Sequence, residues 1–244
     1  MANRQFPDRG SPAVSVPPDW PTGETEALAE QERLRPQVVT EGPAPDRTPG
    51  VLVAGVDVAY DDEKDVVAAA AVLLDYATLE VVEETTAVGP VAFPYLPGLL
   101  AFRELPAVTE ALRGLTVRPE VVVCDGYGLA HPRRFGLASH LGVLTGLRTI
   151  GVAKTPFVFE HREPGPRRGD WSPLLDRGET VGRAVRTREG VKPVFVSVGH
   201  RIGLTEAAEI TLALAPHYRL PETTRRADSL CRRALAAETA ADVQ

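Results

Sequence analysis

Residues 51–88 read VLVAGVDVAYDDEKDVVAAAAVLLDYATLEVVEETTAV. Three runs rich in valine and alanine are separated here by the acidic turn DDEKD and by the short segment YAT. β-Branched residues favour extended strands, and strands joined by so few residues pair in antiparallel fashion, because a parallel pair needs a long crossover. The stretch therefore predicts a three-strand antiparallel meander.

After the meander the apolar residues change from the period of a strand to that of a helix. Leu99, Phe102 and Pro106 fall on one stripe of a helix entered through Pro97. Three later runs are predicted to be buried strands: VVVCD, RTIGVAK and VFVSVGH. A helix is expected between the first two of them, FGLASHLGVLTGL. Two more helices are expected after the third, TEAAEITLALA and PETTRRADSLCRRALAAETA. This order predicts an α/β, ribonuclease H-like fold, with a central mixed β-sheet in which the antiparallel three-strand meander joins parallel strands, flanked by helices.

The two ends of the chain and its compartment follow from composition. Residues 1–24 begin with a stretch rich in proline, serine and glycine, so we expect a disordered N-terminal extension followed by a single domain over residues 25–240. No stretch is long and apolar enough for a membrane helix, and the start lacks the apolar core of a signal peptide. We therefore expect a soluble, cytoplasmic protein, monomeric by default, with Cys124 and Cys231 as reduced packing residues.

The charge of the chain is distributed unevenly. The net charge of −6 argues at first against a nucleic-acid partner, since phosphates are bound by lysine and arginine. Residues 1–125, however, contain 9 basic and 21 acidic side chains, whereas residues 126–244 contain 18 and 12. The basic half is compatible with DNA or RNA, and equally with a solvated arginine-rich surface.

Three acidic residues occupy positions where a buried strand or an apolar helix does not ordinarily place one. Asp57 interrupts VLVAGVDVAY, Glu104 lies on the helix after PYLP, and Asp125 ends VVVCD. A buried carboxylate is costly unless it is hydrogen-bonded or bound to a cation, so the three together indicate a shared Mg²⁺ site. Lys154, at the end of the neighbouring strand, supports this interpretation.

Each of these residues also has an ordinary structural explanation. Asp57 could cap a turn, Asp125 and Gly126 form a common turn dipeptide, and Glu104 could lie on a solvated helix face. Lys154 could be a lysine at a strand end that extends towards solvent. The order of strands and helices favours the shared site over these alternatives.

Six motifs, in this order, resemble the endonuclease V family. They are VAGVDVAY, PYLPGLLAFRELP, DGYGLAHPRRFGLASHLGV, IGVAK, KPVFVSVGHRIGLTEA and LPETTRRAD, and they span about residues 28–228. The resemblance implies a ribonuclease H-like, metal-dependent endonuclease that acts in DNA repair. It would recognise deoxyinosine in single- or double-stranded DNA and hydrolyse the second phosphodiester bond on the 3′ side, using Mg²⁺ or Mn²⁺ and leaving 3′-OH and 5′-phosphate ends.

The same resemblance implies roles for residues of the catalytic centre. Asp57 and Asp125 would be the principal metal ligands, with Glu104 as a further acid of that site. Asp228 would be a second-site metal ligand or would position water. Lys154 would stabilise charge or orient the water.

The family's substrate-binding segments map onto two loops. Pro94 and Pro97 fix the backbone around Tyr95, and the family uses this PYLP segment, including Leu96, as a wedge beside the lesion. Gly98, Leu100 and Gly126 would line the base pocket, and His131 would contact the scissile region. On pattern alone, a core tyrosine and a turn histidine remain open alternatives.

The sequence departs from the family at two positions and contains one unassigned segment. Tyr127 stands where histidine is common, and Thr223 stands where proline is common. The segment EHREPGPRRGDWSPLLDRGET, residues 160–180, is expected to be a surface loop that could follow phosphates.

Three other functions remain open. The family includes members that act on inosine in RNA, so the chain could be an inosine-specific endoribonuclease. It could bind damaged nucleic acid without cutting it. A phosphotransferase of the actin or sugar-kinase type is suggested faintly by GVDVA after a strand, although no second glycine-rich signature accompanies it.

Overall fold

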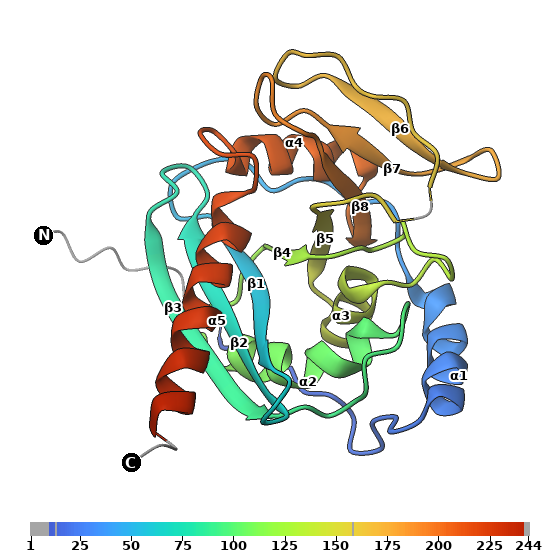
Figure 1. Ribbon diagram of the computed structural model, residues 1–244. Helices are drawn as coiled ribbons and strands as arrows, with labels where there is room; N and C mark the ends of the chain where they lie inside the picture. Colours follow the sequence, from blue (N-terminus) through green and yellow to red (C-terminus); the bar gives the residue numbers. More distant parts are fainter. Residues whose placement is uncertain (1–9, 13, 158, 242–244) are drawn as a thin grey trace, which may run out of the picture.

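The structure is a computed structural model that describes residues 10–12, 14–157 and 159–241. Within these residues the chain forms one mixed sheet of eight strands in the order β3-β2-β1-β4-β5-β8-β7-β6 (Figure 1). The strands are β1 Leu52–Asp61, β2 Val66–Asp75, β3 Val81–Pro90, β4 Val121–Asp125, β5 Arg148–Ala153, β6 Trp171–Asp176, β7 Glu179–Val185 and β8 Val194–His200. The helices are α1 Glu24–Leu34, α2 Leu100–Arg113, α3 Leu137–Thr145, α4 Leu204–Leu214 and α5 Glu222–Ala241, with a 3-10 turn η1 at Arg35–Gln37.

The pairing of the strands confirms the expected fold class. Strands β1, β2 and β3 form the antiparallel meander, and β4 and β5 continue the sheet parallel to β1. Strand β8 then pairs antiparallel to β5. Strand β2 is apolar from Val66 to Leu74 because both of its faces are covered, and Ala68–Leu74 are fully buried.

The two faces of the sheet carry separate halves of the core. Successive strand residues point to opposite faces, so Val53 joins the cluster under α4 and α5, whereas Leu52 and Ala54 join the cluster under α2 and α3. Figure 1 shows α5 running along the strands of the meander. No described helix has the length and apolar content required to cross a membrane.

Helix α5 approaches strand β1 closely at Gly55. A methyl group at this glycine would come within 2.6 Å of the Cβ atom of Thr223, and closer still to the Thr223 backbone. The absence of a side chain at residue 55 therefore sets how near α5 lies to the sheet, and Asp57 and Asp228 lie on these same two elements.

The N-terminal segment falls partly outside the described residues, which exclude 1–9 and 13. Of the residues expected to be disordered, Val14 is buried against the α2 side of the sheet. The Trp20 indole Nε1 donates to the Phe102 carbonyl oxygen at 3.0 Å, and its ring lies 5.2 Å from that of Phe102. The described part of the segment thus packs on α2.

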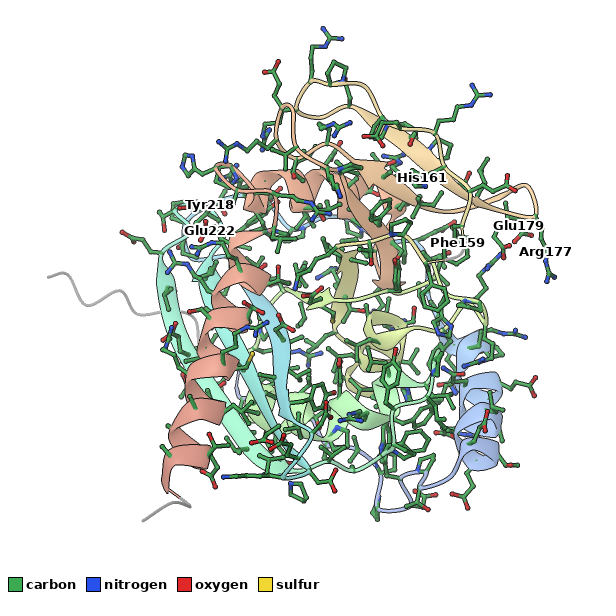
Figure 2. All side chains as sticks on the ribbon, in the orientation of Figure 1. Phe159, His161, Arg177, Glu179, Tyr218 and Glu222 are labelled. Carbon is green, nitrogen blue, oxygen red and sulfur yellow. The ribbon has the colours of Figure 1, made fainter. Side chains whose placement is uncertain are left out.

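The prediction of a surface loop over residues 160–180 was wrong. It contains strand β6 and the start of β7, a hairpin at the end of the sheet (Figure 1). The two-residue turn Arg177-Gly178 has positive φ at both positions, 52° and 85°, which is the geometry of a tight hairpin turn. Figure 2 labels Arg177 and Glu179 at this tip. Pro173 within the strand is compatible with β6 because β6 lies at the edge of the sheet.

Arginines of this region bind protein carbonyls. The Arg186 Nε donates to the Gly165 carbonyl oxygen at 3.1 Å, and its Nη2 donates to the Pro164 carbonyl oxygen at 3.0 Å. The Arg168 Nη2 donates to the Leu212 carbonyl oxygen at 2.6 Å, at the C-terminal end of α4, where cations are favourable. Part of the basic charge in this half of the chain therefore stabilises the fold.

The close approach at Gly55 gives a prediction for stability. We expect Gly55→Ala to lower the free energy of unfolding by about 1–3 kcal/mol, because the added methyl group must displace α5. Gly89→Ala is the matched control, since Gly89 also lies on a strand but its added methyl group meets no atom within 4 Å. Urea unfolding measures both, and equal effects would contradict the proposed contact.

Candidate active site

Two of the predicted acids lie side by side on neighbouring parallel strands. The register pairs Val56 of β1 with Cys124 of β4, so the next residues, Asp57 and Asp125, follow at the same level of the sheet. Lys154 comes directly after β5, the next strand along, and its Nζ forms an ion pair with Asp125 Oδ2. The sheet thus brings a lysine and two carboxylates from three strands together.

Glu104 reaches the same region from helix α2 and is buried there. The Tyr60 hydroxyl, at the end of β1, donates to Glu104 Oε1 at 3.2 Å. The Arg103 guanidinium lies 4.4 Å from the centre of the Tyr60 ring and pairs with Asp62 at 2.5 Å. Tyr60 therefore holds the Glu104 carboxylate against strand β1, and Arg103 packs on the Tyr60 ring. No sequence pattern marks either residue.

The proximity of these carboxyl groups changes their proton affinity. Burial, followed by the charge of Asp125, raises the pKa of Asp57 to about 7. Burial, followed by the charge of Asp57, raises the pKa of Glu104 to about 8. Both shifts have the same physical cause, since charged forms that lose water and repel one another are unfavourable.

The donor set fits a hard cation. Asp57 Oδ1 accepts a hydrogen bond from the Val58 backbone N–H at 2.8 Å, but Asp57 Oδ2 is buried and meets no hydrogen-bond donor among the described residues. Carboxylate oxygens are the ligands that Mg²⁺ prefers, and a cation would offset the repulsion between the acids. As they stand, however, no three His, Cys, Asp or Glu side chains of the described residues are arranged to hold one ion. The metal-ligand assignments remain predictions.

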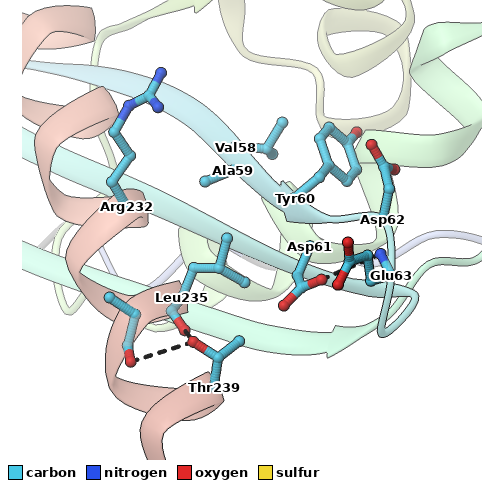
Figure 3. Close-up of a pocket in the computed structure, with 10 residues that line it drawn as sticks. Val58, Ala59, Tyr60, Asp61, Asp62, Glu63, Arg232, Leu235 and Thr239 are labelled. Carbon is cyan, nitrogen blue, oxygen red and sulfur yellow. Dashed lines mark hydrogen bonds between the residues drawn. The ribbon is translucent and has the colours of Figure 1, made fainter.

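Asp228 lies on α5, one helical turn before Arg232, which lines a groove between α5 and β1. Its Oδ1 accepts two hydrogen bonds from Arg232, at 3.1 Å from Nε and 3.0 Å from Nη2. Its charge contributes to the raised pKa of Asp57, which places the two carboxylates within electrostatic range. Figure 3 shows the groove, about 780 Å³ in volume, with Arg232 on the α5 side and Tyr60 and Asp62 on the β1 side.

A second, partly enclosed pocket of about 380 Å³ opens beside Asp125 and Lys154. Most of the residues expected to bind substrate line it. They come from the segment that leads into α2, including its first residue, and from the loop between β4 and α3; these are Tyr95, Gly98, Leu100, Gly126 and His131. Burial lowers the pKa of His131 to about 4, so its imidazole is neutral at pH 7. The structure thus places the predicted base-binding residues against two predicted catalytic residues.

Tyr95 is presented to solvent at the pocket's edge. Its side chain is 67% exposed, and Pro94 and Pro97 beside it are also exposed. Buried residues on either side, Phe93 and Leu99, anchor the segment, and Leu96 packs partly against their cluster. Leu96 therefore contributes to holding the loop, while Tyr95 projects from it.

The pocket also contains aromatic residues without a predicted role. Phe157, three residues after Lys154, lines the pocket and packs edge-on against Tyr127 with ring centres 5.6 Å apart. The Tyr127 hydroxyl donates to the Thr155 carbonyl oxygen. The departure from the family at residue 127 thus closes one wall of the pocket. No periodic pattern marks Phe157, because it lies in a loop.

Arg219 is a further residue that the sequence analysis missed. Its Nη2 donates to the Pro193 carbonyl oxygen at 2.8 Å and to the carbonyl oxygen of Lys154. It thereby ties the loop between α4 and α5 to the end of β5, where the catalytic lysine is expected.

The arrangement of acids, lysine and pocket agrees with the comparison to known proteins. The sequence model of the family described as Endonuclease V matches residues 32–229. The chain belongs to the endonuclease V family. Members are metal-dependent, DNA-cleaving hydrolases, so the predicted family and enzyme class are confirmed, and the phosphotransferase alternative has no support.

Relatives and solved structures show how far the similarity to endonuclease V extends. The chain is 67% identical to endonuclease V of Streptomyces coelicolor over 223 residues, covering 91% of this chain and 95% of that protein. The crystal structure of endonuclease V from Streptomyces avermitilis is 64% identical, with a TM-score of 0.88, and covers 93% of this chain and 99% of its own. A Ciona intestinalis endonuclease V, in complex with a DNA 24-mer containing an inosine followed by a ribo-adenosine, is 29% identical with a TM-score of 0.77, covering 87% and 98%.

The raised pKa of Asp57 gives a prediction about stability. A carboxyl with a pKa near 7 in the folded state and near 4 in the unfolded state lowers the stability of the fold as pH rises through this range, because folding there requires uptake of a proton. In chelator, we expect Asp57→Asn to be more stable than the unsubstituted protein at pH 8, by on the order of 3 kcal/mol. The gain should vanish near pH 4.

Thermal unfolding at both pH values, with and without Mg²⁺, tests this prediction. Added Mg²⁺ should raise the Tm of the unsubstituted protein at pH 8 and leave that of Asp57→Asn nearly unchanged. An Asn variant that is less stable than the unsubstituted protein at pH 8 in chelator would show that Asp57 is not under electrostatic strain.

Proposed function

We propose that this protein is a metal-dependent endonuclease that recognises deoxyinosine in DNA and hydrolyses the second phosphodiester bond on the 3′ side. The proposal rests on the pocket beside Asp125 and Lys154, because this pocket has room for a nucleobase and lies next to the acidic cluster. A related endonuclease V crystallised with inosine-containing DNA supports the choice of base. We propose that the protein acts as a monomer in the cytoplasm, where its buried Cys124 and Cys231 stay reduced.

The acidic cluster would supply the chemistry. Asp57, Glu104, Asp125 and Asp228 would hold Mg²⁺, or Mn²⁺ in its place, and the bound ion would act as a Lewis acid on the phosphate. Lys154 lies beside Asp125, where its ammonium would stabilise the charge that develops on the phosphate oxygens or orient the attacking water. Tyr60 would keep the Glu104 carboxylate in place through its hydrogen bond.

The pocket would supply the recognition. Tyr95 would stack on a base beside the lesion, which contributes about 1–3 kcal/mol and helps to offset the cost of turning one nucleotide out of the stack. Gly98, Leu100 and Gly126 would bring the backbone close to the hypoxanthine edge. The Nδ1 of His131 accepts a hydrogen bond from the Arg133 N–H, so its neutral ring would donate from Nε2 near the scissile strand without adding charge.

The first prediction from this proposal concerns cleavage. End-labelled DNA strands with one deoxyinosine, single- and double-stranded, should be cut at the second phosphodiester on the 3′ side in Mg²⁺ and in Mn²⁺, and should remain intact in chelator. Asp125→Ala should lower the rate by at least about a thousandfold, because it removes both a proposed cation ligand and the partner of Lys154.

Matched substrates distinguish the alternatives. Cutting of inosine RNA in preference to inosine DNA would indicate an endoribonuclease. Tight binding of inosine strands without metal-dependent cutting would indicate a binder that is not an enzyme. Full activity of Asp125→Ala would contradict the assigned catalytic centre.

A second prediction concerns the exposed tyrosine of the pocket. We expect Tyr95→Ala to raise the KM for deoxyinosine DNA about tenfold or more, because it removes the stacking surface. Tyr218→Ala is the matched control, since Tyr218 is 49% exposed but lies near the N-terminal end of α5 (Figure 2), with Arg225 over its ring. Steady-state kinetics should show little change in that control, and equal effects of the two substitutions would contradict a specific role of Tyr95.

A further inference from the structure

Gln31 of helix α1 connects the two loops that form the base pocket. Its side chain is buried, and its residue is 1% exposed. Its amide Nε2 donates to the Gly98 carbonyl oxygen at 3.0 Å and to the Phe135 carbonyl oxygen at 3.1 Å. Its Oε1 accepts a hydrogen bond of 2.5 Å from Arg133 Nε. One side chain thus joins the PYLPG loop to the HPRRF loop.

Gly98 is the residue whose orientation these contacts determine. Its carbonyl oxygen also accepts a hydrogen bond from Arg133 Nη2 at 2.6 Å, so two fixed donors hold it. Its φ of +80° is accessible to glycine at little cost, and a methyl group there would lie 2.8 Å from the same Arg133 Nη2. The peptide that follows Gly98 therefore has one orientation as long as Gln31 and Arg133 are in place.

We propose that Gln31 is a positioning residue that sets the spacing of the two pocket walls and thereby the preference for hypoxanthine over other bases. The inference rests on the proposed function. Gln31 lines the pocket together with Gly98, His131 and Phe135, yet both donor hydrogens and the acceptor oxygen of its amide are engaged by protein groups. Both donor hydrogens of its amide are thus taken up by the loops, and its action on the base is through their position.

A residue that positions the pocket loops should affect the preference for one base more than the rate of phosphodiester hydrolysis. Backbone groups distinguish base edges only when they are held within about 0.5 Å of their positions. The hydrogen bonds of the Gln31 side chain run to the two loops, to Gly98, Phe135 and Arg133, and not to the acidic cluster. Loss of Gln31 should thus loosen the pocket and leave the acidic cluster intact.

The test uses Gln31→Met, which keeps the length of the side chain and removes its hydrogen bonds. Gln37→Met is the matched control, because Gln37 is an exposed glutamine just beyond the same helix. The first measurement for each protein is the ratio of kcat/KM on deoxyinosine DNA to kcat/KM on the same strand with deoxyguanosine. The second is the affinity for each of these strands in chelator, by fluorescence anisotropy. The Mg²⁺-induced rise in Tm reports the state of the acidic cluster separately.

We expect Gln31→Met to reduce the preference for deoxyinosine about tenfold, through KM and through affinity in chelator, with the Mg²⁺-induced rise in Tm preserved. Gln37→Met should behave as the unsubstituted protein. If Gln31→Met does not fold, Arg133→Lys provides the second variant, because it keeps the charge but loses the forked contact with Gln31 and Gly98.

The outcomes separate the inference from the proposed function. A lower Tm with the preference for deoxyinosine unchanged within about twofold would overturn the inference, because Gln31 would then serve stability alone. Loss of the Mg²⁺-induced rise in Tm would also overturn it, because the effect would then extend to the acidic cluster. If the unsubstituted protein shows no preference for deoxyinosine, the proposed function fails first, and the inference fails with it.

Discussion

The repulsion between buried carboxylates at one level of the sheet is the constraint on which the site depends. Asp57 and Asp125 adjoin because the β1–β4 register places them there, and Glu104 approaches from α2. The surrounding residues relieve only part of this repulsion, through the ion pair of Lys154 with Asp125 and the hydrogen bond of Tyr60 with Glu104. The remainder must be offset by protons or by a cation, so the charge that disfavours the fold is also what makes the site suited to a divalent ion.

Helix α5 brings a further carboxylate, Asp228, towards this pair of strands. It lies close to β1 because Gly55 has no side chain, and Asp228 lies further along the same helix. Any shift of α5 away from the sheet would move Asp228 relative to Asp57. The packing of Gly55 against Thr223 therefore affects the distance between the Asp57 and Asp228 carboxylates, although it involves neither of them directly.

Features of this protein that rest on local sequence patterns were predictable, and features that depend on tertiary contacts were not. The meander and the alternating half were predictable because buried strands are long apolar runs, and the acids stood out against those runs. The β6–β7 hairpin was missed because Pro173 and neighbouring arginines resemble a loop, and only the sheet edge makes them acceptable. Tyr60, Phe157 and Gln31 were missed because their partners are distant in sequence; Gln31 contacts Gly98 and Phe135, 67 and 104 residues away.

The base pocket and the acidic cluster of this protein depend on different interactions. The base pocket is fixed by neutral and arginine hydrogen bonds to backbone carbonyls, such as those to Gly98, which do not require a cation. In the acidic cluster, burial and the repulsion between neighbouring carboxylates raise the pKa of Asp57. Asp125 and Lys154 belong to both, because they line the pocket and form the ion pair of the cluster. A base that enters the pocket would therefore lie beside the ion pair of the cluster, so the two shared residues connect recognition to the catalytic centre.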